Sequence, residues 1–223
     1  MLFKNSLMEE NMNTILNLVR HGETEWNTLG KFQGCKDIDL SKEGFLQAKY
    51  LKKRFEDKFD YIYTSPIKRA MRTAEIIAES SKIKPIIELE LREINFGDWE
   101  GLTIKEIEAD FPEKFIEWRN DELNAPMCGG DLSLKKASIR AKEAISGIVK
   151  KHQGDNIIIV AHGGIIKAGL IGIFDWKMTM YHKMLLGNTA VCKIIFDDNF
   201  DPKIVTLNDT SHLPDNYDLK SYV

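Results

Sequence analysis

The sequence predicts a three-layer α/β/α sandwich with a mostly parallel β-sheet and an inserted, largely helical cap. Short apolar segments rich in β-branched residues alternate with segments of helical periodicity, which is typical of sheets built from strand–helix–strand units. Residues 156–161, NIIIVA, are almost continuously apolar, as expected of a strand buried on both faces of a parallel sheet. The length of 223 residues fits one sizeable domain better than two small ones.

The first half of the chain alternates strands with amphipathic helices. Ser41 can cap a helix, because its hydroxyl can accept a hydrogen bond from a free amide of the first turn. Phe45, Ala48 and Phe55 follow at helical spacing. In order, we expect a strand at 14–19, a polar loop to 40, a helix at 41–55, a strand at 60–65, a helix at 67–80 and a short strand near 84–89.

The middle of the chain, about residues 95–130, has a different pattern. It mixes Gly, Trp and Pro with short helical pieces and lacks strand-like alternation, so we expect it to form the cap. Beyond it we expect a helix at 133–152, a strand from 156, a helix at 165–174 and strands at 189–197 and 203–209. The expected organisation is an N-terminal extension at 1–11, one α/β domain at 12–210 and a C-terminal tail at 211–223.

Composition limits the classes of function. The formal charge of −3 gives no basic excess for nucleic acid or an anionic membrane, so we expect neither as a partner. Three widely spaced cysteines, Cys35, Cys128 and Cys192, argue against a disulfide scaffold and favour a reducing, cytoplasmic location. The histidines lack metal-ligand spacing, so no metal site is expected. We also expect no signal peptide and no membrane span.

Two histidines follow two predicted strands in the same way. Both LVRHGE and IVAHGG place His and then Gly directly after an apolar strand. Ligands of open α/β sheets bind at the carboxyl ends of the strands, so His21 and His162 are expected to face one crevice if their strands are neighbours. Gly163 and Gly164 begin the following helix, where free N–H groups favour an anion.

These motifs resemble those of the histidine phosphatase superfamily, which contains the cofactor-dependent phosphoglycerate mutases. LVRHGETEWN, residues 18–27, resembles the signature of that family, and VAHGG resembles its second histidine motif. SPIKRAMRTAEII resembles the segment with a second phosphate-binding arginine, here Arg69, and LREINFGDWEG the segment with the catalytic acid, here Glu93. FQGCKDIDLSKEGFLQA matches the loop that places Gln33 and Gly34 near the substrate. The matches run from about residue 14 to 208 in family order.

The resemblance implies a role for each residue. His21 is the expected nucleophile, and the neighbouring arginines should lower its pKa and keep the imidazole neutral. Glu93 is the expected proton donor, and His162 is expected to stabilise the transition state. Arginine forks suit a phosphate dianion. The full expected set for catalysis and phosphate binding is Arg20, His21, Asn27, Gln33, Gly34, Arg69, Glu93, His162 and Gly163, with no metal and no cofactor.

The motifs leave the reaction open between a phosphatase and a mutase. FGDWEGLT after Glu93 and the acidic cap sequence EIEADFPEKFIEW resemble the phosphatase branches, in particular the broad-specificity and α-ribazole-phosphatase-like members. The expected activity is hydrolysis of small phosphorylated metabolites. The alternatives are a 2,3-bisphosphoglycerate-dependent phosphoglycerate mutase, which would need that cofactor, and a non-catalytic relative that binds phospho-ligands. A homodimer is left open.

The cap is expected to supply the residues that choose a substrate, although each of them could equally pack within the cap. Asp131 stands where the family often has Glu, which puts the identity of the substrate in doubt. The candidates are Trp99, Phe111, Phe115, Trp118 and Met127.

Overall fold

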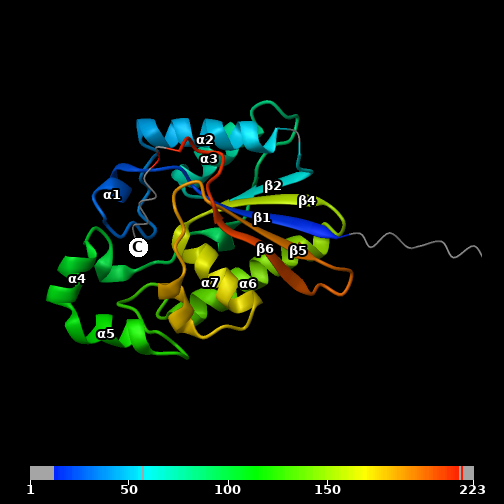
Figure 1. Ribbon diagram of the computed structural model, residues 1–223. Helices are drawn as coiled ribbons and strands as arrows, with labels where there is room; N and C mark the ends of the chain where they lie inside the picture. The colour runs from blue at the N-terminus through cyan, green and yellow to red at the C-terminus, as the bar shows by residue number, and fades with distance from the viewer. Residues whose placement is uncertain (1–12, 57, 216, 218–223) are drawn as a thin grey trace, which may run out of the picture.

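The computed structural model describes residues 13–56, 58–215 and 217, so the expected extension at 1–11 lies outside the described residues. A central sheet separates two pairs of helices, with α2 and α3 on one face and α6 and α7 on the other (Figure 1). The helices α4 and α5 lie beyond one end of the sheet, where the cap was expected. The predicted three-layer α/β/α class is confirmed.

The sheet has six strands in the order β3-β2-β4-β1-β5-β6. The pairings β2–β3, β2–β4 and β1–β4 are parallel, whereas β1–β5 and β5–β6 are antiparallel, so the sheet is mostly parallel as predicted. The strands are β1 (Thr14–Arg20), β2 (Tyr61–Thr64), β3 (Ile86–Ile87), β4 (Asn156–Ala161), β5 (Val191–Phe196) and β6 (Pro202–Asp209).

The register of β1 and β4 positions the two histidines. Arg20 pairs with Ala161, and the amide of His21 donates to the carbonyl of Ala161 at 3.0 Å. Because the strands are adjacent and parallel, their carboxyl ends lie at the same edge of the sheet. His21 and His162 therefore leave the sheet side by side.

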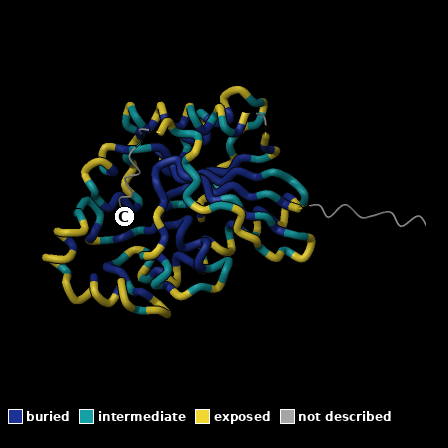
Figure 2. The backbone as a smooth tube through the Cα atoms, in the orientation of Figure 1, coloured by how far each residue is buried: buried dark blue, intermediate teal, exposed yellow. Residues whose placement is uncertain are grey.

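Helices cover the sheet on both faces and divide the core in two. One apolar cluster joins β1, β2 and β4 to α2 and α3, and a larger one joins the other face to α6, α7 and the cap. The strands β1, β2, β4 and β5 and the helix α7 form the buried centre of the molecule (Figure 2). The helices are α1 (Glu25–Thr28), α2 (Lys42–Phe55), α3 (Lys68–Ala78), α4 (Ile104–Asp110), α5 (Pro112–Asn120), α6 (Leu134–Lys151) and α7 (Gly163–Ile173).

Local hydrogen bonds explain where some elements begin. The Ser41 hydroxyl accepts from the amide of Gly44, which confirms the predicted cap of α2. Thr24 and Asn27 form a reciprocal capping box, so a single helical turn, α1, stands in the expected loop. The strand expected near 84–89 has only two residues, because Pro85 cannot donate to a neighbouring strand and the segment lies at the sheet edge.

The cap is held together by aromatic packing. Phe115 and Trp118 of α5 lie 5.7 Å apart between ring centroids, and Trp99 lies 5.3 Å from Trp118. Trp118 also contacts Tyr181 of the 3₁₀ helix η3 (Met178–Lys183) at 5.6 Å. Short 3₁₀ turns, η1 (Leu89–Leu91) and η2 (Gly97–Trp99), lead into this region. The rings fix the cap against η3, which packs against α7.

The candidate substrate-choosing residues of the cap serve this packing instead. Trp99, Phe115, Trp118 and Met127 are all buried, and none of the five expected residues lines the pocket described below. Their size and apolar character allow them to fill the cap core, which is why sequence alone could not separate the two roles.

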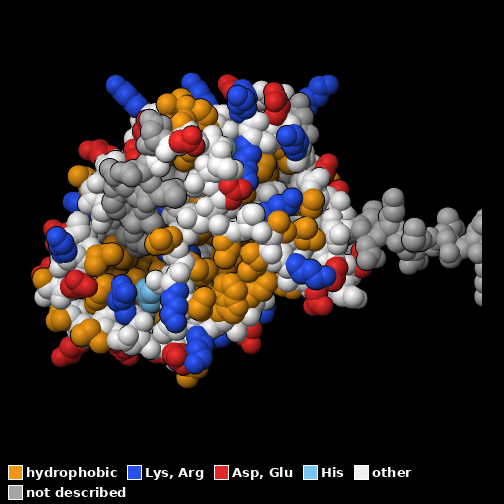
Figure 3. All heavy atoms as spheres, in the orientation of Figure 1, with side chains coloured by type: hydrophobic (Ala, Val, Ile, Leu, Met, Phe, Trp, Pro, Cys, Tyr) orange, Lys and Arg blue, Asp and Glu red, His pale blue; other side chains and the backbone are white. Residues whose placement is uncertain are grey.

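On the face shown in Figure 3, Lys and Arg side chains stand among Asp and Glu rather than in one basic area. None of the described helices combines the length and apolar character needed to cross a membrane.

Candidate active site

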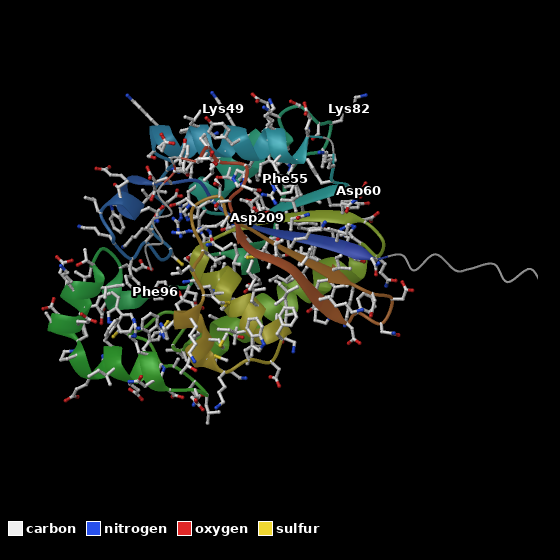
Figure 4. All side chains as sticks on the ribbon, in the orientation of Figure 1. Lys49, Phe55, Asp60, Lys82, Phe96 and Asp209 are labelled. Carbon is white, nitrogen blue, oxygen red and sulfur yellow. The ribbon has the colours of Figure 1, made fainter. Side chains whose placement is uncertain are left out.

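A polar pocket lies at the carboxyl ends of β1 and β4, between the sheet and the cap. Phe96, labelled in Figure 4, is on the cap side of this pocket. The lining residues are Arg20, His21, Asn27, Lys31, Phe32, Gln33, Gly34, Arg69, Glu93, Phe96, Gly163, Gly164 and Tyr181. Eight of the nine expected site residues are in this set, and the ninth, His162, has its ring centroid 5.2 Å from that of His21. The structure therefore brings all nine together.

His21 is held as a neutral ring whose one lone pair, on Nε2, faces Arg69. Its Nδ1 lies 2.6 Å from the carbonyl of Gly22, which can only accept, so Nδ1 carries the proton. Nε2 accepts from Nε of Arg69 at 3.1 Å, so this nitrogen is unprotonated. Burial, and then the charges of Arg69 and Arg20, hold the pKa of His21 well below 6.5. This confirms the predicted effect of the arginines, although burial is the larger cause.

Gly22 makes the position of His21 possible. A Cβ at Gly22 would lie 2.5 Å from the carbonyl oxygen of Gly44, where α2 packs against the strand end. The Gly22 amide donates to the hydroxyl of Thr73 at 3.1 Å, and this ties the turn to α3. The glycine is thus required by the close approach of two backbones.

Arg69 is fully buried on the first turns of α3 and joins three segments. Besides His21, it donates to the carbonyls of Lys36 at 2.7 Å and Gly34 at 2.8 Å. These contacts fold the loop that carries Gln33 against the histidine. A guanidinium has five N–H donors, so two are left for an oxyanion among the described residues. Burial lowers the pKa of Arg69 from 12.5 to about 10, which leaves it charged at neutral pH.

Arg20 is the last residue of β1 and is 4% exposed. Its Nη1 donates to the carbonyl of Leu186. A Cβ at Gly163 would come within 3.3 Å of its Nε, so this glycine leaves room for the guanidinium. Burial lowers the pKa of Arg20 to about 10, and the nearby Glu93 opposes part of this shift. The pocket therefore contains two permanent cations beside His21.

His162 has the complementary hydrogen-bonding pattern. Its Nε2 lies 2.7 Å from the hydroxyl of Ser65, and that hydroxyl accepts from the amide of Ile67 at 3.3 Å. Because Ile67 already donates to its oxygen, the Ser65 hydroxyl can direct its proton to Nε2, and we assign the ring proton of His162 to Nδ1 on this pattern. Nδ1 is buried and has no partner among the described residues. It is a buried N–H that a ligand oxygen can satisfy.

Glu93 is held by the first turn of α7. Its carboxylate accepts from the amides of Gly164 at 3.1 Å, Ile165 at 2.8 Å and Ile94 at 2.9 Å. These amides and the helix dipole stabilise the negative charge. An anion was expected at this helix start. At the amide of Gly164 that anion is the carboxylate of Glu93 rather than a phosphate. A Cβ at Gly164 would lie 2.7 Å from an oxygen of this carboxylate, which explains the second glycine.

Two amide side chains complete the expected set. Oδ1 of Asn27 accepts from the amide and hydroxyl of Thr24 and from Nδ2 of Asn188 at 3.1 Å, so its amide nitrogen remains for a ligand. Oε1 of Gln33 is buried without a partner among the described residues. Asn188 also donates to the carbonyl of His21 at 3.2 Å and braces the turn that carries the imidazole.

Residues 16–210 match the histidine phosphatase superfamily (branch 1). The chain belongs to this superfamily. Phosphoserine phosphatase 1 of Hydrogenobacter thermophilus is 32% identical over 201 residues, which cover 90% of this chain and 94% of that protein. A 2,3-bisphosphoglycerate-dependent phosphoglycerate mutase of Bartonella tribocorum is 32% identical over 171 residues, which cover 73% of this chain and 82% of the mutase.

Solved structures of this superfamily have the same fold. The phosphoserine phosphatase of Entamoeba histolytica in complex with 3-phosphoglyceric acid has a TM-score of 0.84 and 36% identity, covering 90% of this chain and all of that one. A putative α-ribazole-5′-phosphate phosphatase of Escherichia coli has a TM-score of 0.77 and 25% identity, covering 88% and 97%. Within the superfamily, the relatives identify this chain as a phosphoric monoester hydrolase.

Sequence analysis of this hydrolase missed several pocket residues. Lys31 and Phe32 directly precede Gln33 and could have been included with it. Ser65 opens the SPIKRAMRTAEII motif but was given no role there, and Tyr181 lies outside every motif, so only the fold shows that both reach the site. In the part of the chain that the structure describes, no group of three His, Cys, Asp or Glu side chains is arranged to hold a metal ion.

Proposed function

We propose that the enzyme hydrolyses small phosphomonoesters through a phosphohistidine on Nε2 of His21, with Glu93 as the proton donor. The observation that carries this proposal is the tautomer of His21. Nδ1 is bonded to a carbonyl and Nε2 keeps its lone pair beside two arginines. A neutral imidazole with a fixed lone pair can attack phosphorus where the phosphate charge is neutralised.

In the first step, Nε2 of His21 forms a bond to phosphorus as the bond to the ester oxygen breaks. Arg20 and Arg69 bind the phosphoryl oxygens, and the open Nδ1–H of His162 donates to one of them. Asn27, Gln33, Gly34 and Gly163 line the same space. Glu93 gives its proton to the leaving oxygen, which departs as an alcohol. The phosphate dianion entering beside this carboxyl favours the protonated form by like-charge repulsion.

In the second step, water replaces the alcohol. Glu93, now ionised, accepts a proton from the water as its oxygen bonds to phosphorus and the N–P bond breaks. Inorganic phosphate leaves and His21 returns to its neutral form. The second step uses the residues of the first in reverse roles, so we propose that no metal and no cofactor take part.

A mutase is the second candidate. It shares the first step but transfers the phosphoryl group to another hydroxyl, and a mutase relative matches 73% of the chain. The FGDWEGLT sequence and the acidic cap favour hydrolysis, as do relatives named phosphoserine phosphatase, one of them metal-independent. A non-catalytic relative is disfavoured because the nucleophile, the acid and both arginines stand in one pocket. We place the reaction in the cytoplasm, which the three free cysteines support.

The test is a screen of phosphorylated metabolites, including phosphoserine and 3-phosphoglycerate, with and without 2,3-bisphosphoglycerate. We expect release of inorganic phosphate without the bisphosphate. Isomerisation of 3-phosphoglycerate that requires the bisphosphate would identify the mutase instead. Binding without any turnover would identify the non-catalytic relative.

A further inference from the structure

Tyr181 is the one pocket-lining residue that comes from η3, next to the cap. It is 1% exposed, and its ring packs against Trp118 at 5.6 Å and His182 at 5.3 Å. These contacts fix the ring, so the position of the hydroxyl is set before a ligand arrives. The mechanism above gives this residue no task.

The hydroxyl of Tyr181 and the carboxylate of Glu93 both lie beside Gly164 in the pocket. The hydroxyl has no hydrogen-bond partner among the described residues, although it is fully buried. A Cβ at Gly164 would lie 3.0 Å from this oxygen and 2.7 Å from a carboxylate oxygen of Glu93, so both groups border one small space. Buried hydroxyls are nearly always bonded, and one that faces a pocket without a partner is suited to a ligand.

The charges around this hydroxyl favour an anionic ligand group. Arg20 and Arg69 match the two charges of a phosphate. Lys31 also lines the pocket, and the ammonium of buried Lys167 lies 5.0 Å from the centroid of the Tyr181 ring. A cation over the ring withdraws electron density and strengthens the hydroxyl as a donor.

The protonation state of Tyr181 agrees with a donor role. Burial, and then the charge of Glu93, raise its pKa well above 10. The hydroxyl therefore keeps its proton throughout the range in which His21 is neutral.

We propose that Tyr181 determines specificity, because its hydroxyl donates a hydrogen bond to a carboxylate on the leaving group of the substrate. This selects phosphorylated hydroxy acids and amino acids over phosphomonoesters that lack a carboxylate. The inference rests on the proposed function, since it takes Glu93 as the group that protonates the ester oxygen. The carbon skeleton of the leaving group then extends from Glu93 toward the hydroxyl.

The experiment compares phosphoserine with phosphoethanolamine, which lacks only the carboxylate, in the wild type and in Tyr181→Phe. We expect the variant to lose about 10- to 100-fold in kcat/KM for phosphoserine, mainly through KM. For phosphoethanolamine the loss should be under about twofold, because no bond to the hydroxyl is removed. The control is Tyr50→Phe, on α2 and away from the pocket, which should leave all values unchanged.

Two further measurements test whether Tyr181→Phe is folded and whether Tyr181 acts only through Glu93. Since no described residue hydrogen-bonds to the Tyr181 hydroxyl, the Phe variant should have a melting temperature equal to or above that of the wild type. The pH profile of kcat/KM for phosphoethanolamine should be unchanged, whereas a residue acting through Glu93 would shift it. Equal losses on both substrates, no loss on phosphoserine, or a wild type without preference for phosphoserine would overturn the inference. Absence of turnover in the wild type would instead overturn the proposed function.

Discussion

The ends of β1 and β4 carry the same His-Gly sequence, yet the structure holds the two imidazoles in opposite ways. Nδ1–H of His21 donates a hydrogen bond to a carbonyl, and Nε2 carries the lone pair. His162 receives the Ser65 hydroxyl at Nε2 and keeps a proton on Nδ1. A nucleophile needs a lone pair and a stabiliser of phosphoryl oxygens needs a donor. The two strand ends thus differ in the hydrogen-bond partner of each ring, and the two proposed roles follow from that difference.

The largest expected effect separates these roles directly. His21→Ala should reduce kcat by about 10,000-fold or more, because the attacking atom is removed. His162→Ala should reduce it by about 100- to 1,000-fold, the usual cost of one transition-state donor. Acid-labile phosphate labelling should disappear in the first variant and persist in the second. Labelling that survives in His21→Ala would show that His21 is not the residue that forms the phosphohistidine.

Glu93 links the end of β4 to the proposed proton transfer, because its carboxylate accepts hydrogen bonds from the first amides of α7, the helix that follows His162. Glu93→Gln should slow hydrolysis of phosphoserine by about 100- to 10,000-fold, since an alkoxide must leave without a proton. The loss should be much smaller with p-nitrophenyl phosphate, whose phenolate leaves readily. Steady-state kinetics on both substrates measure the contrast. Equal losses would show that Glu93 acts by holding α7 rather than by giving a proton.

The partner of His162 offers a finer test. Ser65→Ala should reduce kcat by about tenfold, because Nε2 loses the hydroxyl that fixes the tautomer and the loss of one hydrogen bond costs about 1 kcal/mol. The matched control is Ser146→Ala on α6, which should have no effect. Nitrogen chemical shifts of the imidazole report the tautomer. An unchanged His162 tautomer in Ser65→Ala would show that the Ser65 hydroxyl does not fix it.

Burial of both rings predicts a pH dependence of stability. The pKa values of His21 and His162 are held well below 6.5, first by burial and then by the arginines. Below pH 6.5 the unfolded chain takes up protons that the folded chain does not, so stability is lost as the pH falls. Each ring should contribute about 1.4 kcal/mol per pH unit to the loss. Urea unfolding at pH 7.5 and 5.5 measures this loss of stability. Between these two pH values, His162→Gln should lose less stability than the wild type.

The sequence was sufficient where the signal is contiguous. Apolar strands followed by His-Gly predicted both strand ends, and the parallel register of β1 and β4 then brings the rings together. The same reasoning could not find Ser65, because its role depends on β2 lying beside β4. Nor could it find Tyr181, which reaches the pocket from a 3₁₀ segment without periodicity. Contacts between distant segments are set by packing, which single-sequence patterns do not contain.

The order of helices and strands was predicted more fully than the ligand of the backbone amides at the start of α7. Helix and strand order follows from periodicity, whereas the length of β3, the turn α1 and the 3₁₀ segment η3 differed from expectation. Gly163 and Gly164 were expected to bind an anion, and the structure shows that the amide of Gly164 binds Glu93. A free helix start attracts any carboxylate that the fold brings near, so the anion cannot be identified from the glycines alone.

The smallest expected effect is that of a chelator. Kinetics of phosphate release after incubation with EDTA should match those of the untreated enzyme within about twofold. Two arginines supply the positive charge that a metal ion supplies in other phosphoryl-transfer enzymes, and both remain charged with pKa values of about 10. In the proposed mechanism, Glu93 supplies the proton that a metal-bound water would otherwise carry. Loss of activity in EDTA that a divalent ion restores would show that the groups at the two strand ends do not suffice.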